Sequence, residues 1–272
     1  MKKYFLKQRH FGFQLVLLLL LVNVNSAISH DFWLEAHPFY TSPSKTVEIS
    51  IHVGNEFAGD SLPNIPNWYS DFSLYQPGSK TKIEGEMGRD PAGFFTPDKN
   101  GTYAIGYQST YTYIEIEPEI FLKYLTMEGL EHAIAYRQKN NLTDTPGKEN
   151  YIRHPKALVQ SGDSFEIDNS TLTFGYELEI IPLSNPYRKK LNDKLSVKVL
   201  YQGKPIKDIL LIALTRASPE KTQSVRTDAQ GVATIELNQT GPWLLKAVHI
   251  LNLKDKKADW ESHWASLTFE MR

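Results

Sequence analysis

The chain has 272 residues, with 30 Lys and Arg against 31 Asp and Glu, eight His and no Cys. A formal net charge of −1 provides no basic surface of the kind that nucleic-acid binding needs. Without cysteine, disulfides, zinc–thiolate sites, iron–sulfur clusters and thiol nucleophiles are excluded, so a metal site must use His, Asp, Glu, backbone or a free amine. The length and the 41% hydrophobic content predict one large or two modest globular domains.

Residues 1–29 have the pattern of a secretory signal peptide. Lys and Arg within 2–9 precede an apolar run at 11–22, which is shorter than the roughly 20 apolar residues of a spanning helix. Ala27 and Ser29 have the small side chains expected before a signal-peptidase cut, so we expect cleavage after Ser29 and export to the periplasm. Cleavage removes four positive charges and no negative one, which takes the net charge from −1 to −5. An uncleaved N-terminal anchor is the alternative.

Cleavage after Ser29 makes His30 the first residue of the mature chain. Its α-amine, with an ordinary pKa of about 7.7–8.0, and its imidazole form a chelate that suits Cu(II), Ni(II) or Co(II). A cut after Ala27 instead leaves two residues before His30, whose amides and imidazole suit square-planar Cu(II) or Ni(II). Both cuts predict the same class of ion. The alternative interpretation is that His30 simply begins a strand.

The first half of the mature chain is predicted to consist mainly of short β-strands. Over 46–53, apolar and polar residues alternate, which places His52 on the face opposite Val47, Ile49 and Ile51. Further strands are expected at 72–76, 101–107 and 110–117, separated by turn-forming residues. Such spacing favours an antiparallel sandwich over alternating α/β units.

One segment has the spacing of a helix. After Pro118, apolar residues recur near a period of 3.6, which predicts a helix from about 119 to 139 that ends at Asn140 and Asn141. His132 lies on this helix and is expected to be a solvated or capping residue. The basic and polar stretch 148–154 is expected to lead into a turn at 162–163.

The second half is again predicted to be strand-rich, with strands at 172–181, 195–201, 209–214, 232–237, 241–250 and 264–270. The turns at 203–206 and 227–231 are typical of immunoglobulin-like or transthyretin-like sandwiches. We therefore expect a mainly β protein of two antiparallel β-sandwich units with one helical insertion near 119–139. The expected organisation is a signal peptide at 1–29, an N-terminal β-rich domain at 30–170 and a C-terminal immunoglobulin-like sandwich at 171–272.

The remaining histidines suggest a nitrogen-rich metal site, which needs strand ends to converge. His52 and His249 lie on predicted strands, and together with His30 they would provide three ligands; His37 is a fourth candidate. Weaker candidates are His263 and the oxygen donors Glu35, Glu56 and Glu261. The spacing alone is a weak signal, because each of these histidines could equally be an ordinary hydrogen-bonded or exposed residue.

Enzymatic motifs are absent from the sequence. It contains no Gly-x-Ser-x-Gly or His-Glu-x-x-His motif and no glycine-rich phosphate loop. The tyrosines within 103–113 could line a carbohydrate platform, although packing within a sheet also explains them.

Three blocks of the sequence resemble a bacterial family of exported domains of unknown function, labelled as nickel uptake or as the periplasmic component of cobalt–nickel transport. The blocks are 30–35, directly after the signal peptide, 176–186, and 241–249 together with 259–269. The resemblance implies a periplasmic β-sandwich protein that handles a divalent transition-metal ion. His30 and His249 match the family's blocks, whereas His37 and His263 stand where the family usually has other residues, which puts those two in doubt as ligands.

The leading hypothesis is a periplasmic protein that binds Ni²⁺ or Co²⁺, with Cu²⁺ as a further fit, and supplies it to an inner-membrane metal transporter without bond-making chemistry. Its predicted metal ligands are His30, His249, His52 and His37. No nucleic acid and no stable membrane insertion after signal cleavage are expected. One alternative is a cell-envelope sandwich module that binds a partner or a glycan, and another is a copper redox enzyme that uses an N-terminal histidine site.

Overall fold

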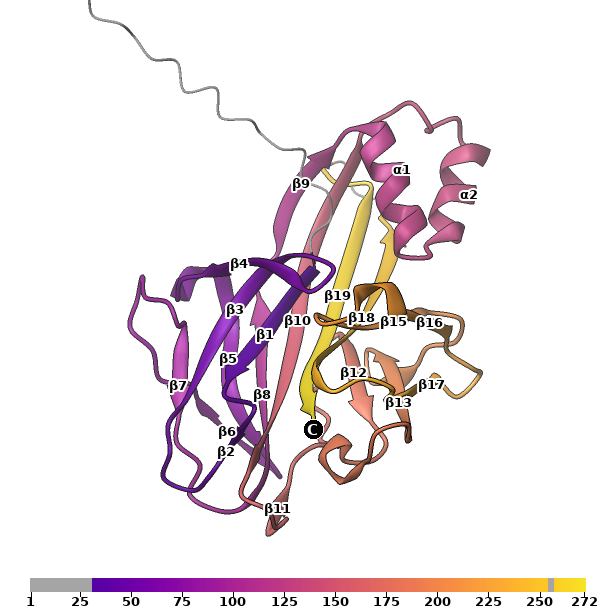
Figure 1. The fold of residues 1–272 in the computed structure, drawn as a ribbon. Helices are drawn as coiled ribbons and strands as arrows, with labels where there is room; N and C mark the ends of the chain where they lie inside the picture. The colour runs from indigo at the N-terminus through magenta and orange to yellow at the C-terminus, as the bar shows by residue number, and fades with distance from the viewer. Residues whose placement is uncertain (1–30, 254–256) are drawn as a thin grey trace, which may run out of the picture.

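The computed structural model describes residues 31–253 and 257–272, and the mainly β fold predicted from the sequence is confirmed. The predicted signal peptide and His30 lie outside the described residues. Strands of the described part form three sheets, which we name the central, front and back sheets. Figure 1 shows the front sheet on one side of the central sheet and the back sheet on the other.

The central sheet is the largest, with eleven strands among the described residues, and its main path runs β16-β15-β18-β19-β10-β8-β5-β6. The bounds along this path are Gln223–Arg226, Leu210–Thr215, Gly241–Asn252, Trp260–Met271, Gly147–Ser161, Gly101–Ser109, Tyr69–Gln76 and Ser79–Lys82. Short strands β2 (Tyr40–Thr41), β9 (Thr112–Ile116) and β11 (Ile167–Asp168) pair with it off this path.

The two smaller sheets each have four strands within the described ranges. The front sheet contains β1 (Asp31–His37), β3 (Val47–Asn55), β4 (Ala58–Leu62) and β7 (Gly93–Phe95). The back sheet contains β12 (Leu178–Pro182), β13 (Lys194–Tyr201), β14 (Lys204–Pro205) and β17 (Val232–Glu236). Single 3₁₀ turns occur at Pro66–Trp68, Pro186–Arg188 and Pro219–Lys221.

The longest strand, β10, contains the basic and polar stretch 148–154, for which the sequence pattern predicts no strand. It runs antiparallel to β8 and β9 but parallel to β19. The central sheet is therefore mixed, whereas the sequence predicted purely antiparallel sheets. The predicted domain boundary near residue 170 falls between β11 and β12, and strands from both sides of it join in the central sheet through the β10–β19 pair.

Two apolar cores separate the layers. Alternate residues of β18 and β19, including Leu245 and Leu267, pack against the back sheet residues Leu195 and Val197. On the other side, Ala157 and Val159 of β10 belong to a core with the front sheet, whose contributions include Leu34, Ile49 and Ile51. The period of two along each strand therefore decides which layer a side chain contacts.

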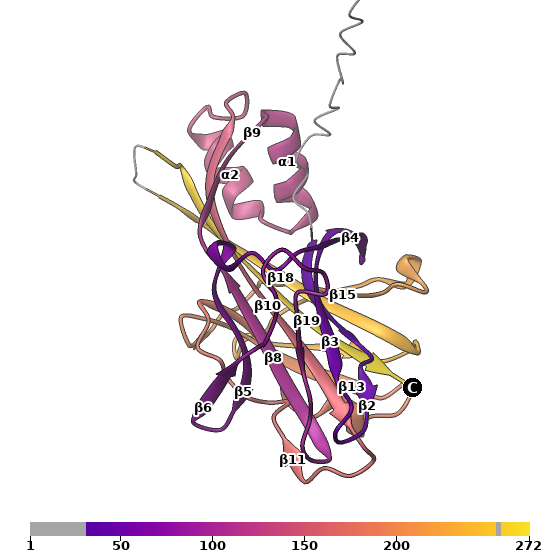
Figure 2. The same ribbon diagram turned by 90° about the vertical axis from the view of Figure 1, so that its left-hand side faces the viewer.

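The predicted helix at 119–139 is wrong in one respect, because two helices take its place: α1 (Pro118–Met127) and α2 (Glu131–Lys139). Gly129 lies between them at a φ of +65°, a left-handed conformation that a helix cannot contain. Both helices lie at one end of the molecule beside β9 (Figure 2). None of the helices in 31–253 and 257–272 is long and apolar enough to cross a membrane.

Replacing Gly129 by Ala is expected to destabilise the protein by more than the roughly 1–2 kcal/mol of a left-handed residue. An added Cβ would lie 2.8 Å from Nη2 of Arg226 and from Cδ2 of Leu210. Gly203→Ala is the matched control, because Gly203 has a φ of +72° and nothing within 4 Å of an added Cβ. Urea unfolding should show the larger loss for Gly129→Ala; an equal or smaller loss would contradict the steric argument.

Candidate metal centre

Pairing of β1 with β3 gathers three potential metal ligands on one face of the front sheet. Trp33, Glu35 and His37 alternate along β1, and His52 of β3 lies directly opposite Trp33 in the strand register. The intervening residues of β1 face the front core. The same alternation that buries the apolar residues therefore directs the polar ones to a common face.

The three side chains approach one another closely. Nε2 of His37 lies 3.7 Å from Oε1 of Glu35, and Nε2 of His52 lies 3.8 Å from Oε2 of the same carboxylate. One ligand atom from each residue lies within 4.8 Å of the other two. Glu35 is buried, the His52 side chain is 16% exposed and the His37 side chain is 49% exposed, so the cluster opens to solvent on the His37 side.

His52 is held in place by stacking, while its ring nitrogens lack partners. The ring lies parallel to the Trp33 indole, with centroids 5.2 Å apart and an interplanar angle of 7°. Neither Nδ1 nor Nε2 has a hydrogen-bond partner among the described residues, although both are buried. Burial lowers the pKa of His52 in spite of the nearby Glu35 charge, so the imidazole is neutral near pH 7 and can act as a ligand.

Arg216 and Trp33 hold the Glu35 carboxylate through three hydrogen bonds. Nη1 donates to Oε1 at 2.9 Å, Nη2 donates to Oε2 at 2.6 Å, and the Trp33 indole adds a third donor at 3.1 Å. Burial alone would raise the pKa of Glu35, but these hydrogen bonds and the Arg216 charge hold it below its ordinary value. The carboxylate is therefore ionised, and an ion bound here would share it with the guanidinium.

The donor set of two imidazoles and one carboxylate suits divalent transition-metal ions. Imidazole nitrogen favours Zn(II), Cu(II), Ni(II) and Co(II), whereas Mg(II) and Ca(II) prefer oxygen alone. The residues present thus fit the class of ion predicted from the sequence. The unpaired, buried nitrogens of His52 are the observation on which that fit depends.

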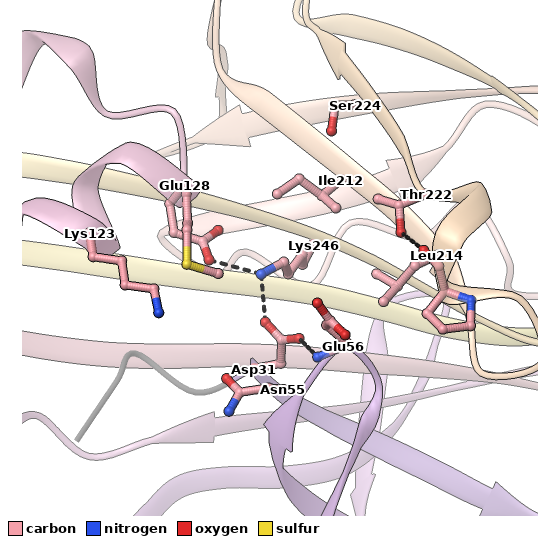
Figure 3. A pocket seen from close by; sticks show the side chains of 12 residues that line it. Asp31, Asn55, Glu56, Lys123, Glu128, Ile212, Leu214, Thr222, Ser224 and Lys246 are labelled. Atoms are coloured by element: carbon pink, nitrogen blue, oxygen red, sulfur yellow. Dashed lines mark hydrogen bonds and ion pairs between the residues drawn. The ribbon is translucent and has the colours of Figure 1, made fainter. Parts of the chain in front are cut away.

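Asp31, the first residue of β1, lies away from the Glu35–His37–His52 cluster and lines a cavity of about 490 Å³. Figure 3 shows Lys246 of β18 between the carboxylates of Asp31 and Glu128, to which Nζ donates at 2.6 and 2.8 Å. Burial alone would lower the pKa of Lys246, but these two carboxylates raise it to about 12. Glu56 lines the same cavity, and the backbone N–H of Glu56 donates to Asp31.

The predicted ligands therefore do not all come together. His37 and His52 meet at Glu35, whereas Asp31, which follows His30 in the chain, begins the other end of β1. Six residue steps of about 3.3 Å each separate Asp31 from His37 by roughly 20 Å. His30 itself lies outside the described residues.

His249 faces the back sheet, away from the front-sheet cluster. It lies opposite His263 in the β18–β19 register and has the parity of Leu245 and Ala247, which belong to the back core. Trp33, by contrast, packs against Leu244, which points the other way. The structure thus does not bring His249 to His37 and His52, because the central sheet lies between them.

The weaker candidates are also distributed over the fold. His132 lies with Nε2 3.0 Å from the carbonyl oxygen of Ile250, and Glu261 lies beside His263. Arg216 and His154 were not predicted as parts of any site; Arg216 follows β15 without a motif, and His154 lies in the unrecognised strand β10. Of the aromatic stretch, Tyr103 and Tyr107 are buried in the sheet whereas Tyr111 and Tyr113 are about half exposed.

With the layered β fold and the His–Glu cluster established, the chain can be compared with known proteins. Residues 27–251 match a family described as "Domain of unknown function (DUF4198)", and the chain belongs to that family. No protein with a curated description matches the sequence. The family description assigns no activity, so nickel or cobalt transport stays a prediction.

Solved structures offer only distant likenesses. The D0-D1 domain of intimin is 12% identical, with 89% of this chain and 98% of that chain covered, and a TM-score of 0.21. Three N-terminal domains of the Hoc capsid protein of bacteriophage RB49 are 10% identical, with 89% and 71% covered and a TM-score of 0.22. A Salmonella alpha-2-macroglobulin is 11% identical, with 91% and 16% covered and a TM-score of 0.23. TM-scores this low carry no argument about the present chain.

Proposed function

We propose that this protein is an exported, periplasmic carrier of a divalent transition-metal ion, Ni(II) or Co(II) with Cu(II) as a further fit, which it delivers to a metal transporter of the inner membrane. The observation that carries the proposal is the cluster of Glu35, His37 and His52, in which a buried imidazole has two unpaired nitrogens. An unpaired buried polar group is costly, and coordination of an ion would satisfy it.

The partial exposure of the cluster suits a carrier. His37 is half exposed and His52 is largely covered, so an ion can enter at His37 without unfolding of the sheet. Arg216 places a positive charge on Glu35 and weakens the attraction of the carboxylate for a cation. A site whose carboxylate is partly neutralised by an arginine releases its ion more readily than a fully anionic site, as delivery to a transporter requires.

A second locus is proposed at the mature N-terminus. If the signal peptide is removed after Ser29, the α-amine and imidazole of His30 provide a chelate adjacent to Asp31. The length of β1 separates Asp31 from His37 by roughly 20 Å. The two loci would therefore bind ions independently.

Calorimetric titration of the tag-free mature protein with NiCl₂, CoCl₂ and CuCl₂ tests the proposal. His52→Ala and His37→Ala should each weaken binding at the cluster at least about tenfold, as loss of even an indirect ligand contact does in metal sites. His30→Ala should remove only the N-terminal contribution. His132→Ala is the matched control, because His132 contacts a backbone carbonyl away from the cluster, and it should leave every isotherm unchanged. Unaltered binding in both cluster variants would refute the carrier site.

A further inference from the structure

A second group of histidines lies on the back-sheet side of the central sheet. His154, His263 and His249 come from the neighbouring strands β10, β19 and β18. His263 lies opposite His249 in register, and His154 lies opposite Ala265, two residues further along β19. His154 and His263 are both almost wholly buried, and the Tyr201 ring contacts both His249 and His263.

The spacing of the two buried imidazoles matches the edge of a tetrahedral metal site. Nε2 of His154 lies 3.5 Å from Nδ1 of His263, and the two rings are nearly parallel, with an interplanar angle of 9°. Metal–nitrogen bonds of about 2.0–2.1 Å place neighbouring ligand atoms of a tetrahedron roughly 3.3–3.4 Å apart. Neighbouring ligands in a square plane or octahedron would be closer, at about 2.9 Å.

Glu261 orients His263 as an outer partner of a metal ligand does. With a proton on Nε2, His263 donates to Oε1 of Glu261 at 3.0 Å, and the lone pair of Nδ1 then points toward His154. A carboxylate that accepts the distal N–H of a histidine is the usual support of a zinc ligand. Burial lowers the pKa of His263 and lowers that of His154 to about 3, so both imidazoles are neutral at pH 7.

Glu177 provides a third donor. Its Oε2 lies 3.8 Å from Nε2 of His154, and its side chain is 38% exposed. The Glu177 carboxylate does not lie within 4.8 Å of both Nε2 of His154 and Nδ1 of His263, so it has to rotate toward His263. The rotation breaks the 3.3 Å hydrogen bond that Oε2 accepts from Nε2 of Gln108. Glu177 directly precedes β12 of the back sheet, whereas both histidines belong to the central sheet.

We infer that His154, His263 and Glu177 form a second metal site, separate from the Glu35–His37–His52 cluster, which takes a tetrahedral divalent ion such as Zn(II) and links the back sheet to the central sheet. The fourth position is left for water. This site has a structural role, and it does not depend on the proposed carrier function. The competing description is a hydrogen-bond relay from His154 through His263 to Glu261 with no ion.

The test is Zn(II) binding to the mature protein, followed by calorimetry and by thermal unfolding with and without ZnCl₂. Glu177→Gln is the principal variant, because this exposed side chain can be changed without disturbing the buried rings. It should weaken Zn(II) binding at this site at least about tenfold and abolish most of the zinc-dependent rise in Tm. Glu220→Gln, an exposed carboxylate on another surface, is the matched control.

Cobalt substitution gives an independent measurement, because tetrahedral Co(II) absorbs visible light far more strongly than octahedral Co(II). The tetrahedral spectrum should persist in His52→Ala, which affects only the carrier cluster, and disappear in His263→Gln. If the cluster is only a relay, His263→Gln will change stability while zinc affinity and the cobalt spectrum stay the same, and the inference is overturned. If the unmodified protein shows this spectrum but binds no ion at the Glu35–His37–His52 cluster, the result counts against the proposed function alone.

Discussion

Replacing Lys156 by Met is expected to destabilise the protein by about 3–5 kcal/mol, because it leaves a buried carboxylate without its counter-charge. Nζ of Lys156 donates to Oε1 of Glu179 at 2.8 Å, and both side chains are at most 2% exposed. Two backbone carbonyls, of Leu172 and Ile180, accept the remaining ammonium protons at 3.2 Å. Glu179 also accepts from the backbone N–H of Phe174 at 2.6 Å, so it cannot leave its place cheaply.

The double variant Lys156→Met with Glu179→Gln separates the charge from the packing. The Gln oxygen can still accept the backbone N–H of Phe174, and no unpaired charge remains, so we expect the double variant to recover much of the loss. Arg89→Met is the control for an exposed ion pair, since Arg89 and Glu86 are each more than 70% exposed, and it should change stability by no more than about 1 kcal/mol. Urea unfolding measures all three; a single Lys156→Met variant as stable as the unmodified protein would rule out this argument.

Strands that bury one face could be predicted from the sequence. Apolar alternation identified β3 and β13 to within two residues at each end, because their inward residues pack into an apolar core and their outward residues do not. The same alternation correctly placed His52 on the face away from Ile49 and Ile51. The alternation could not show that β1 pairs with β3, and so it could not show that the Glu35 carboxylate lies beside His52.

The first half of strand β10 could not be recognised, because several of its buried residues are polar. Glu149, His154 and Lys156 are almost wholly buried, and each takes its partners from a distant part of the chain. Pro155 in the middle of the run also argues against a central strand. A strand whose polar groups are satisfied only by tertiary contacts carries no local hydrophobic period, and His154 was missed with it.

Convergence of the histidines depends on layer order, which no local pattern contains. His52 and His249 were grouped because both lie on strands, yet one belongs to the front sheet and the other faces the back sheet. The parity of His249 was readable, but the side of the sheet to which that parity points is set by the packing of the whole molecule. His37 joined His52 instead, through the β1–β3 register.

A pH dependence of stability is expected from Glu149. Its side chain is buried beneath the hydroxyls of Ser262 and Tyr124, both of which donate to Oε1, while Oε2 has no partner among the described residues. Burial raises the pKa of Glu149 to about 7 in spite of these hydrogen bonds, from an ordinary value of 4.5. Between these two pH values the folded state keeps a proton that the unfolded state releases.

Because the folded pKa is the higher one, the contribution of Glu149 is most favourable at low pH and is lost as the pH rises. The free energy of unfolding should fall by about 1.4 kcal/mol per pH unit between roughly pH 4.5 and 7, about 3 kcal/mol in all. Glu149→Gln is neutral at every pH and should remove this loss. Any constant cost of the Gln amide cancels when the change between pH 5 and pH 8 is compared, so urea unfolding at these two values isolates the titration. The variant should gain about 2–3 kcal/mol relative to the unmodified protein over this interval, whereas parallel pH profiles would show that Glu149 is already ionised in the folded state at pH 5.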